Sequence, residues 1–243
     1  FLDINSGVLG GTIYFWTHIT PITLRADLPP GTAGSGDLAY TSDDYAAWNS
    51  TGGLATYAAR ADKVLLRIPS GKIAAGQAFF ATSIASGKQA VFENTMRLDK
   101  AGDILDNSQF FKINSNSKTS STIEKNRLWL NLTNTQGAFK QTLIGYIKGA
   151  TNEYDNVYDG VSFNGNAYID FYSVQNSKNY AIQGRALPFD DNDIVPLGYK
   201  TTIVGEFKIS IDKADGVLVN KKIYLEDKLL GITQDLSLAP YTF

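Results

Sequence analysis

The alternation of apolar and polar residues is most regular in the middle of the chain, over residues 127–150. Every second residue from Leu128 to Leu132 is a leucine, and a second alternating stretch covers residues 143–148. A period of two is that of a pleated strand, whose side chains point to opposite faces. Residues 134–137, Asn-Thr-Gln-Gly, suit a turn, because glycine accepts positive φ and asparagine bonds its own backbone. The pattern therefore predicts a long β-hairpin.

Shorter stretches rich in β-branched and aromatic residues predict further strands on both sides of this hairpin. They lie at residues 10–18, 64–68, 73–82, 89–92, 168–174, 181–186, 201–211 and 222–226. Over residues 207–212 the alternation is strict, with one apolar and one polar face. Ser42 stands ahead of residues 43–48 in the position of a helix cap, so a short helix could start there, but residues 49–53 would end it within two turns.

The fold class predicted from these patterns is all-β. No long stretch keeps the 3.6-residue period of a helix, and the predicted strands follow one another at the spacing of roughly 8–12 residues found in sandwiches. We therefore expect an antiparallel β-sandwich of the jelly-roll or Ig-like kind. The segment 114–121, NSNSKTSS, has the composition of a linker. It suggests two packed sandwich-like halves, residues 1–118 and 119–243, with one continuous domain as the alternative.

The composition argues against several classes of binding partner and binding site. Hydrophobic residues make up 43% of the 243 residues, which is enough for a folded core. The 22 basic and 24 acidic side chains nearly balance, and the basic residues are not clustered, which argues against nucleic acid as a partner. The absence of cysteine excludes disulfides and thiolate metal sites. No apolar run approaches the ~18 residues of a membrane span, so no membrane insertion is expected.

Catalytic motifs are not evident. His18 is the only histidine, so a nucleophile–histidine–carboxylate triad would have to use it. The chain has no G-x-S-x-G, H-E-x-x-H or P-loop motif. A hydrogen-bonded histidine at the end of a strand is the favoured interpretation of His18, and we predict no catalytic residue. Paired carboxylates of a glycosidase are not visible in a sequence, since their separation decides the chemistry.

Three acidic clusters have the oxygen ligands that calcium prefers, at residues 99–107, 154–160 and 190–193. None matches the EF-hand pattern, and aspartate and asparagine are common in solvated turns. The best candidates for calcium ligands are Asp190, Asp191 and Asp193. Apart from such a structural calcium ion, no cofactor is expected.

Aromatic side chains offer a second kind of site, because their rings lie flat on the apolar faces of sugars. A wide set of tryptophans and tyrosines could contribute, Tyr172 among them, although most aromatic residues of a β-sandwich lie in its core. The residues predicted on loops are the better candidates for contacting a glycan. They are Tyr45, Trp48, Tyr154 and Tyr158.

Ten segments spread over nearly the whole chain carry a resemblance to known proteins. They are GTIYFWTH at 11–18, DYA at 44–46, GQAFF at 76–80, NTMR at 94–97, NRLWLNLTN at 126–134, QGAFKQTL at 136–143, GATNEYD at 149–155, IQGRALPFD at 182–190, VPLGY at 195–199 and YLEDK at 224–228. Together they resemble large surface proteins of gliding and marine Bacteroidetes. In those proteins such a region lies just ahead of the carboxy-terminal sorting domain recognised by the type IX secretion system.

The resemblance implies a location more than an activity. It implies a secreted or cell-surface protein, with the type IX secretion machinery and surface polysaccharides as partners. The sequence starts at Phe1 and stops at Phe243 before any sorting domain, so we expect a piece of a longer polypeptide. The leading hypothesis is a non-catalytic structural or adhesive module. The alternatives are a carbohydrate-binding module attached to a polysaccharide-degrading enzyme and, third, a glycan hydrolase or lyase.

Overall fold

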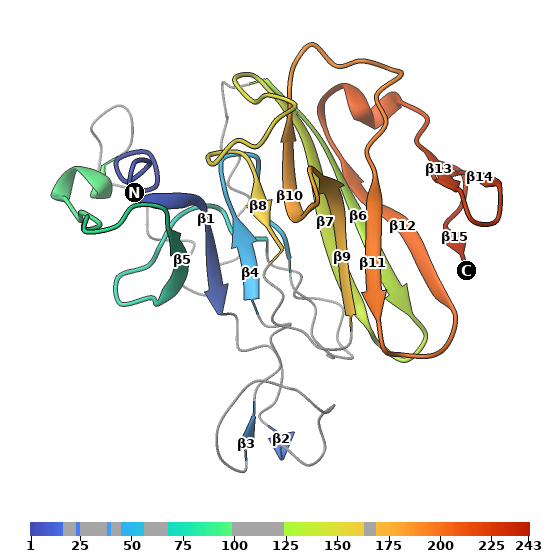
Figure 1. Cartoon of the computed structure of the whole chain (residues 1–243), viewed down its shortest axis with the longest axis horizontal. Helices are drawn as coiled ribbons and strands as arrows, with labels where there is room; N and C mark the ends of the chain where they lie inside the picture. The colour runs from blue at the N-terminus through green and yellow to red at the C-terminus, as the bar shows by residue number, and fades with distance from the viewer. Residues whose placement is uncertain (17–22, 25–37, 40–44, 56–67, 99–123, 163–168) are drawn as a thin grey trace, which may run out of the picture.

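The computed structural model describes residues 1–16, 23–24, 38–39, 45–55, 68–98, 124–162 and 169–243, and the structural statements below concern these residues. The described chain is nearly all β (Figure 1), which confirms the predicted class. Its helical turns are two short 3₁₀ helices, η4 (Asn94–Arg97) and η6 (Gly216–Asn220). No helix in this part of the chain is long and apolar enough to cross a membrane. Outside it lie His18, the acidic cluster at 99–107 and the linker at 114–121.

The largest sheet has the strand order β11-β9-β10-β7-β6-β12-β15, with β8 on an edge of β10. Its strands are β6 (Lys125–Asn134), β7 (Phe139–Ile147), β8 (Gly160–Val161), β9 (Ile169–Gln175), β10 (Lys178–Arg185), β11 (Leu197–Thr201), β12 (Phe207–Ala214) and β15 (Tyr241–Thr242). The predicted hairpin is confirmed as β6 and β7. In its turn, Asn134 Oδ1 accepts the N–H of Ala138 at 2.8 Å, and Gly137 has a φ of +94°.

One pair of strands departs from the predicted antiparallel arrangement. Strands β7 and β10 are parallel, with Ile182 opposite Leu143 and Gly184 opposite Gly145. Parallel neighbours need a long crossover connection, and here residues 148–177 supply it. The prediction of an antiparallel sheet is therefore wrong at this pair, while the other described strand pairs of the sheet are antiparallel.

The large sheet curls around a main core, because strands far apart in its order contribute to the same cluster. The buried members of the main core are Leu128, Leu130, Leu132, Ile144, Tyr146, Ile169, Phe171, Phe207, Ile209, Leu218, Leu236 and Tyr241. The leucines of β6 and the apolar face of β12 both point into it, which confirms the two alternations found in the sequence. A small hairpin of β13 (Tyr224–Asp227) and β14 (Ile232–Asp235) lies near the C-terminus (Figure 1).

The N-terminal sheet has three strands in the order β4-β1-β5. They are β1 (Leu9–Trp16), β4 (Tyr45–Trp48) and β5 (Phe79–Ser83), and a separate two-stranded ribbon joins β2 (Thr23–Leu24) to β3 (Leu38–Ala39). The short helix that the sequence allows at 43–48 does not form in the described residues, which are β4. Backbone pairing with β1, from Ile13 opposite Trp48 to Trp16 opposite Tyr45, overrides the local capping signal.

Two strand predictions in this region fail, one in part and one completely. The strand predicted at 73–82 exists only from Phe79 onward, since Gln77 donates its N–H to the Ala74 carbonyl at 3.1 Å in a turn. The strand predicted at 89–92 is also wrong. There the N–H of Val91 bonds Asn5 Oδ1 at 2.7 Å, and the side-chain amide of Asn5 bonds the Val91 carbonyl at 3.0 Å.

A second cluster lies between the two sheets, and we call it the inter-sheet core. Its buried members are Tyr14, Ala47 and Leu54 from the N-terminal sheet and its following loop, and Trp129, Leu143, Ala181 and Ile182 from the large sheet. Strands β6 and β7 are consequently covered on both faces. For this reason Trp129, on the face of β6 opposite its leucines, is only 2% exposed.

Candidate functional site

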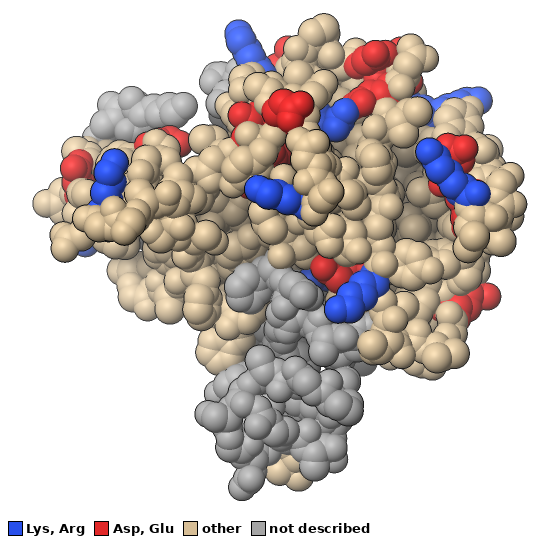
Figure 2. Space-filling view, in the orientation of Figure 1, with Lys and Arg blue, Asp and Glu red and all other residues tan. Residues whose placement is uncertain are grey.

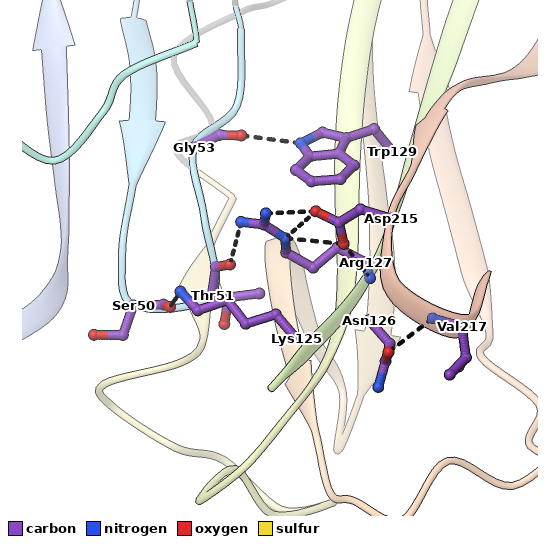
Figure 3. Close-up of polar contacts among 9 residues, drawn as sticks. All are labelled: Ser50, Thr51, Gly53, Lys125, Asn126, Arg127, Trp129, Asp215 and Val217. Atoms are coloured by element: carbon purple, nitrogen blue, oxygen red, sulfur yellow. Dashed lines mark hydrogen bonds and ion pairs between the residues drawn. The ribbon is translucent and has the colours of Figure 1, made fainter. Parts of the chain in front are cut away.

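The two sheets meet along a line of polar contacts that we call the inter-sheet seam. It joins residues 49–53, which follow β4, to Lys125, Arg127 and Trp129 of β6 and to Asp215 beside η6. Figure 3 shows the side chains of β6 reaching from the large sheet toward the backbone of residues 50–53. The seam brings together segments that are far apart in the sequence: Thr51 and Arg127 are 76 residues apart, and Arg127 and Asp215 are 88 residues apart.

Arg127 is the centre of the seam. Its guanidinium bonds the Asp215 carboxylate through Nε at 2.9 Å and Nη2 at 2.5 Å, and its Nη1 bonds the Thr51 carbonyl at 3.2 Å. The backbone N–H of Arg127 donates to the same carboxylate at 2.9 Å. Charge-assisted, two-pronged bonds of this kind fix orientation as well as contributing energy. One side chain therefore links β6, the segment after β12 and the N-terminal loop.

Lys125 and Trp129 flank Arg127 and make equivalent contacts. Lys125 Nζ donates to the Ser50 carbonyl at 2.7 Å, and Trp129 Nε1 donates to the Gly53 carbonyl at 3.0 Å. Burial, reinforced by the nearby positive charge of Arg127, lowers the pKa of Lys125. The three donors occupy every second position of β6, so they share one face of the strand. They hold the backbone of the N-terminal loop rather than its side chains.

Two glycines let the loop come this close. Gly145 and Gly184 lie opposite each other on the parallel strands β7 and β10. A Cβ on Gly145 would stand 2.5 Å from the methyl group of Thr51, and one on Gly184 would stand 2.5 Å from the Cβ of Tyr158. Glycine inside a strand often marks a point where another backbone approaches closely. The glycine pair makes the flat patch on which the seam is built.

The connection between β7 and β8 forms the second side of the seam. Asn49 Nδ2 and the Thr51 hydroxyl both donate to the carbonyl of Tyr158, at 2.9 and 2.6 Å. Further along, the N–H of Gly11 in β1 donates to the carbonyl of Asn156 at 2.8 Å. The connection thus belongs to the large sheet by sequence but bonds directly to the N-terminal sheet.

Asp159 anchors this connection to the large sheet. Its carboxyl oxygens accept the N–H of Gly184 at 2.8 Å and the N–H of Asp155 at 2.7 Å, and the residue is only 3% exposed. Burial raises the pKa of Asp159 to about 6, although the two N–H donors favour the charged form. The Asp159 carbonyl also accepts the hydroxyl of Thr12 from β1 at 3.0 Å. Asp159 is therefore a buried, titratable group at the junction.

The comparisons with known proteins place the chain in one family. A family model described as a domain of unknown function, DUF8693, matches residues 1–243. The chain belongs to the DUF8693 family. No curated protein and no solved structure matches it. Both sheets and the seam lie within the residues that the DUF8693 model covers.

The predicted calcium ligands of this DUF8693 chain have protein partners. Asp193 receives Arg185 Nε and Nη2, both at 2.6 Å, and the Tyr146 hydroxyl at 2.8 Å. Burial acts to raise the pKa of Asp193, but the hydrogen bonds from Arg185 and Tyr146 outweigh it and leave the pKa below its ordinary value. Asp193 is thus the acceptor of a structural ion pair.

The other two carboxylates of this cluster bond elsewhere. Asp191 pairs with Lys221 at 2.6 Å, and Asp190 accepts the N–H of Asn192 at 2.9 Å. Within the described ranges, no three histidine, cysteine, aspartate or glutamate side chains gather as metal ligands would. Calcium binding by the 190–193 cluster stays a prediction.

The four aromatic residues predicted to bind glycans have different neighbours. Two of them belong to β4. The ring of Tyr45 lies 5.5 Å from that of Phe80, and the ring of Trp48 covers Gly71, where a Cβ would come within 2.3 Å.

The other two predicted residues lie on the connection between β7 and β8. Tyr158 packs against Gly184, as described above. Tyr154 is 43% exposed and stacks on Tyr180 with 6.2 Å between ring centres, while Lys178 Nζ lies 4.7 Å from the Tyr154 ring. Of the four, Tyr154 has the position best suited to contact a ligand.

The seam residues themselves were not predicted as functional. Lys125, Arg127 and Trp129 have a signal in the sequence, since alternate positions of a strand share a face, but their acceptors are backbone carbonyls without a residue signature. The surface charges do not suggest another site. On the face shown in Figure 2, acidic and basic side chains are interspersed among the described residues rather than gathered by sign.

Proposed function

We propose that this DUF8693 chain is a non-catalytic structural and adhesive module of a secreted or cell-surface protein exported by type IX secretion. The resemblance to Bacteroidetes surface proteins supports the location. The inter-sheet seam supports the structural role, and the observation that carries it is the row of three β6 side chains bonded to the carbonyls of Ser50, Thr51 and Gly53 in the N-terminal loop. We also propose that each half of the chain is a sandwich of the jelly-roll or Ig-like kind.

A spacer has to hold its parts at fixed positions, and the seam has the properties needed. An exposed ion pair alone contributes little, because solvent screens it. The side chains of Arg127 and Asp215 are only 23% and 27% exposed, and the guanidinium also bonds backbone on the opposite sheet. The inter-sheet core lies alongside. Polar contacts fix the geometry of the joint, and the buried apolar surface stabilises it.

Equilibrium unfolding tests whether the two sheets act as one rigid unit. Tryptophan fluorescence and far-ultraviolet circular dichroism should give coincident urea transitions for the native chain. Arg127→Met should lower the free energy of unfolding by about 1.5–3 kcal/mol, the range for hydrogen bonds to charged groups, and should separate the two transitions. Coincident transitions in this variant would count against the seam as the joint.

Arg185→Met is the matched control. Arg185 also forms a two-pronged pair with an aspartate, Asp193, but both partners lie in the C-terminal region. This variant should lose stability without separating the transitions. The location is tested by fractionating cells that produce the full-length protein, with and without a working type IX system. Retention inside cells only when the system is blocked is expected, and unchanged distribution would contradict the proposal.

A further inference from the structure

A hollow on the outer side of β9 has features of a ligand site. It has a volume of about 340 Å³, at the lower end of the ~300–1,000 Å³ typical of ligand pockets. Asp170 and Tyr172 of β9 line it, together with Lys200 of β11 and Ser162, Lys178 and Asn179 nearby. Most of these side chains are polar, and one is aromatic.

Tyr172 is held flat by a glycine on the neighbouring strand. Gly198 of β11 lies directly opposite Tyr172, and a Cβ on it would stand 2.5 Å from the Cε2 atom of the ring. The ring therefore covers Gly198 with one face, and the residue lines the hollow. A rigid aromatic ring in a polar hollow is a suitable surface for the apolar face of a sugar.

The charges that a ligand would meet in the hollow are positive. Lys178 and Lys200 are both exposed. The carboxylate of Asp170 is 5% exposed and is already bonded to the Ser162 hydroxyl at 2.9 Å and to the backbone N–H of Phe171 at 2.9 Å. Its negative charge is turned inward, whereas the two ammonium groups face solvent. This arrangement favours an anionic ligand.

A second aromatic ring borders the same place. Lys178 Nζ, 4.7 Å from the Tyr154 ring, connects the hollow to that ring by a cation–π contact. Tyr154 comes from the connection between β7 and β8, so two separate segments place aromatic side chains around one lysine. The surface available to a chain-like ligand thus extends beyond the hollow itself.

We propose that this hollow binds a sugar unit that carries an anionic group, either a carboxylate or a sulfate ester. Tyr172 stacks on the apolar face of the ring, Lys178 and Lys200 pair with the anionic group, and Asn179 hydrogen-bonds a sugar hydroxyl. Tyr154 contacts the next unit of the chain. The site goes beyond the structural role of the module and does not depend on the seam.

Titration calorimetry of the intact chain with three oligosaccharides of equal length tests the proposal. The probes are an oligogalacturonate, a sulfated carrageenan oligosaccharide and a neutral cello-oligosaccharide. At least one anionic probe should bind ten-fold or more tightly than the neutral one, and added salt should weaken that binding because it screens the lysines. Comparison of the two anionic probes decides between carboxylate and sulfate. Equal affinity for all three, or binding by none, would overturn the proposal.

Variants locate the binding in the hollow. Tyr172→Ala should reduce the affinity at least ten-fold, and Lys200→Met and Lys178→Met several-fold each. Lys222→Met, at an exposed lysine outside the hollow, is the matched control and should leave the affinity unchanged. The lysine substitutions are on the surface, so they remain informative if Tyr172→Ala fails to fold. Binding that survives both lysine substitutions would overturn the assignment.

Gly198→Ala tests the positioning of the ring without altering a residue that lines the hollow. The added methyl group displaces Tyr172, so the affinity should fall while both lysines remain. Gly7→Ala is its control, since a Cβ there meets nothing within 4 Å. Unchanged affinity in Gly198→Ala would show that the flat ring is not part of the site.

Discussion

The N-terminal region, residues 1–98, and the C-terminal region, residues 124–243, solve the problem of burying a sheet in different ways. The C-terminal region curls its sheet around the main core, whose buried members all come from its own strands, η6 and adjoining segments. The N-terminal sheet has three strands, and Tyr14, Ala47 and Leu54 of its region pack against the large sheet. Small sheets need a packing partner for stability. The comparison indicates that the N-terminal region depends on the C-terminal region more than the reverse.

The packing on the far side of the N-terminal sheet supports this difference. Phe79 of β5 packs edge-on against Phe1 and Phe15, with ring centres 5.3 and 6.5 Å apart. Phe92 stacks on Phe1 yet remains 70% exposed. These aromatic contacts join residues of the N-terminal region to one another. Less apolar surface is removed from water here than in the main core, so less stability is expected.

The largest expected effect comes from removing the side chain that both regions share. Trp129→Ala should cost about 3–5 kcal/mol, the range for truncating a buried aromatic side chain. It should also release the N-terminal region first, because Trp129 contacts that region by packing and by its bond to Gly53. Hydrogen exchange measured by mass spectrometry should show β1 and β4 losing protection before β12.

Leu132→Ala supplies the matched control for Trp129→Ala. Leu132 is fully buried in the main core, so its truncation should cost about 2–5 kcal/mol. Both regions should then lose protection together, because the N-terminal region packs against the C-terminal region whose core is weakened. If Trp129→Ala also exposes β1 and β12 in step, the proposed dependence of one region on the other is wrong.

The next effect, in size, acts at the junction through pH. Asp159 has a pKa of about 6 in the folded chain and 3.8 ordinarily, so between these values the folded state holds a proton that the unfolded state has lost. Stability should therefore fall as pH rises from about 4 to about 6 and then stay level. The total change attributable to Asp159 is about 2–3 kcal/mol, since one pKa unit corresponds to about 1.4 kcal/mol.

Asp159→Asn isolates this contribution from that of the other carboxyl groups. The difference in free energy of unfolding between the native chain and the variant should change across the same pH window. Asp155 and Arg185 both influence Asp159, so the variant series should be measured at constant salt. Parallel stability curves from pH 4 to pH 7 would mean that Asp159 is already ionised in the folded chain.

The smallest of the three effects is confined to the N-terminal region. Asn5 is 1% exposed, and its side chain bonds both backbone groups of Val91, at 2.7 and 3.0 Å. Asn5→Ala should cost roughly 1–2 kcal/mol, the order expected for losing such bonds. Faster exchange of the Val91 amide, with unchanged exchange in β12, is the expected signature.

Asn192→Ala is the control for Asn5→Ala. Asn192 is exposed, and its side-chain amide bonds Asp190 within the same turn. Its replacement should change stability by less than about 0.5 kcal/mol. If Asn5→Ala accelerated exchange throughout β12 as well, the two regions would be more tightly coupled than the comparison implies.

The parts of the fold that follow from local pattern were predictable. The hairpin of β6 and β7 and the alternation in β12 depend only on a period of two and on turn chemistry, both visible in the sequence. The strand predicted at 73–82 is shortened by a local turn, whereas other failures have non-local causes. β4 was not predicted as a strand because its pairing with β1 leaves no local mark in the sequence, and the parallel pairing of β7 with β10 depends on the path of the whole crossover.

Part of the seam could be predicted from the sequence. Gly145 and Gly184 interrupt strand patterns, which is a signal for close approach of another backbone, and the donors of β6 share one face. The sequence does not predict that residues 49–53 lie on that face. The hollow shows the same limit, because nothing near Tyr172 in the sequence reveals that Gly198 lies beneath its ring.

The seam constrains its two sides unequally. Lys125 and Arg127 contribute through their side chains, whereas Ser50 contributes a backbone carbonyl that every amino acid possesses. Substitutions at Ser50 can therefore accumulate without loss of the joint, while those at Lys125 and Arg127 cannot. For protein engineering, the side chains of β6 offer a surface that can bind the backbone of a different loop. A foreign loop should be accepted at this position if its backbone follows the same path and it keeps Asn49 and Thr51, whose side chains bond the carbonyl of Tyr158.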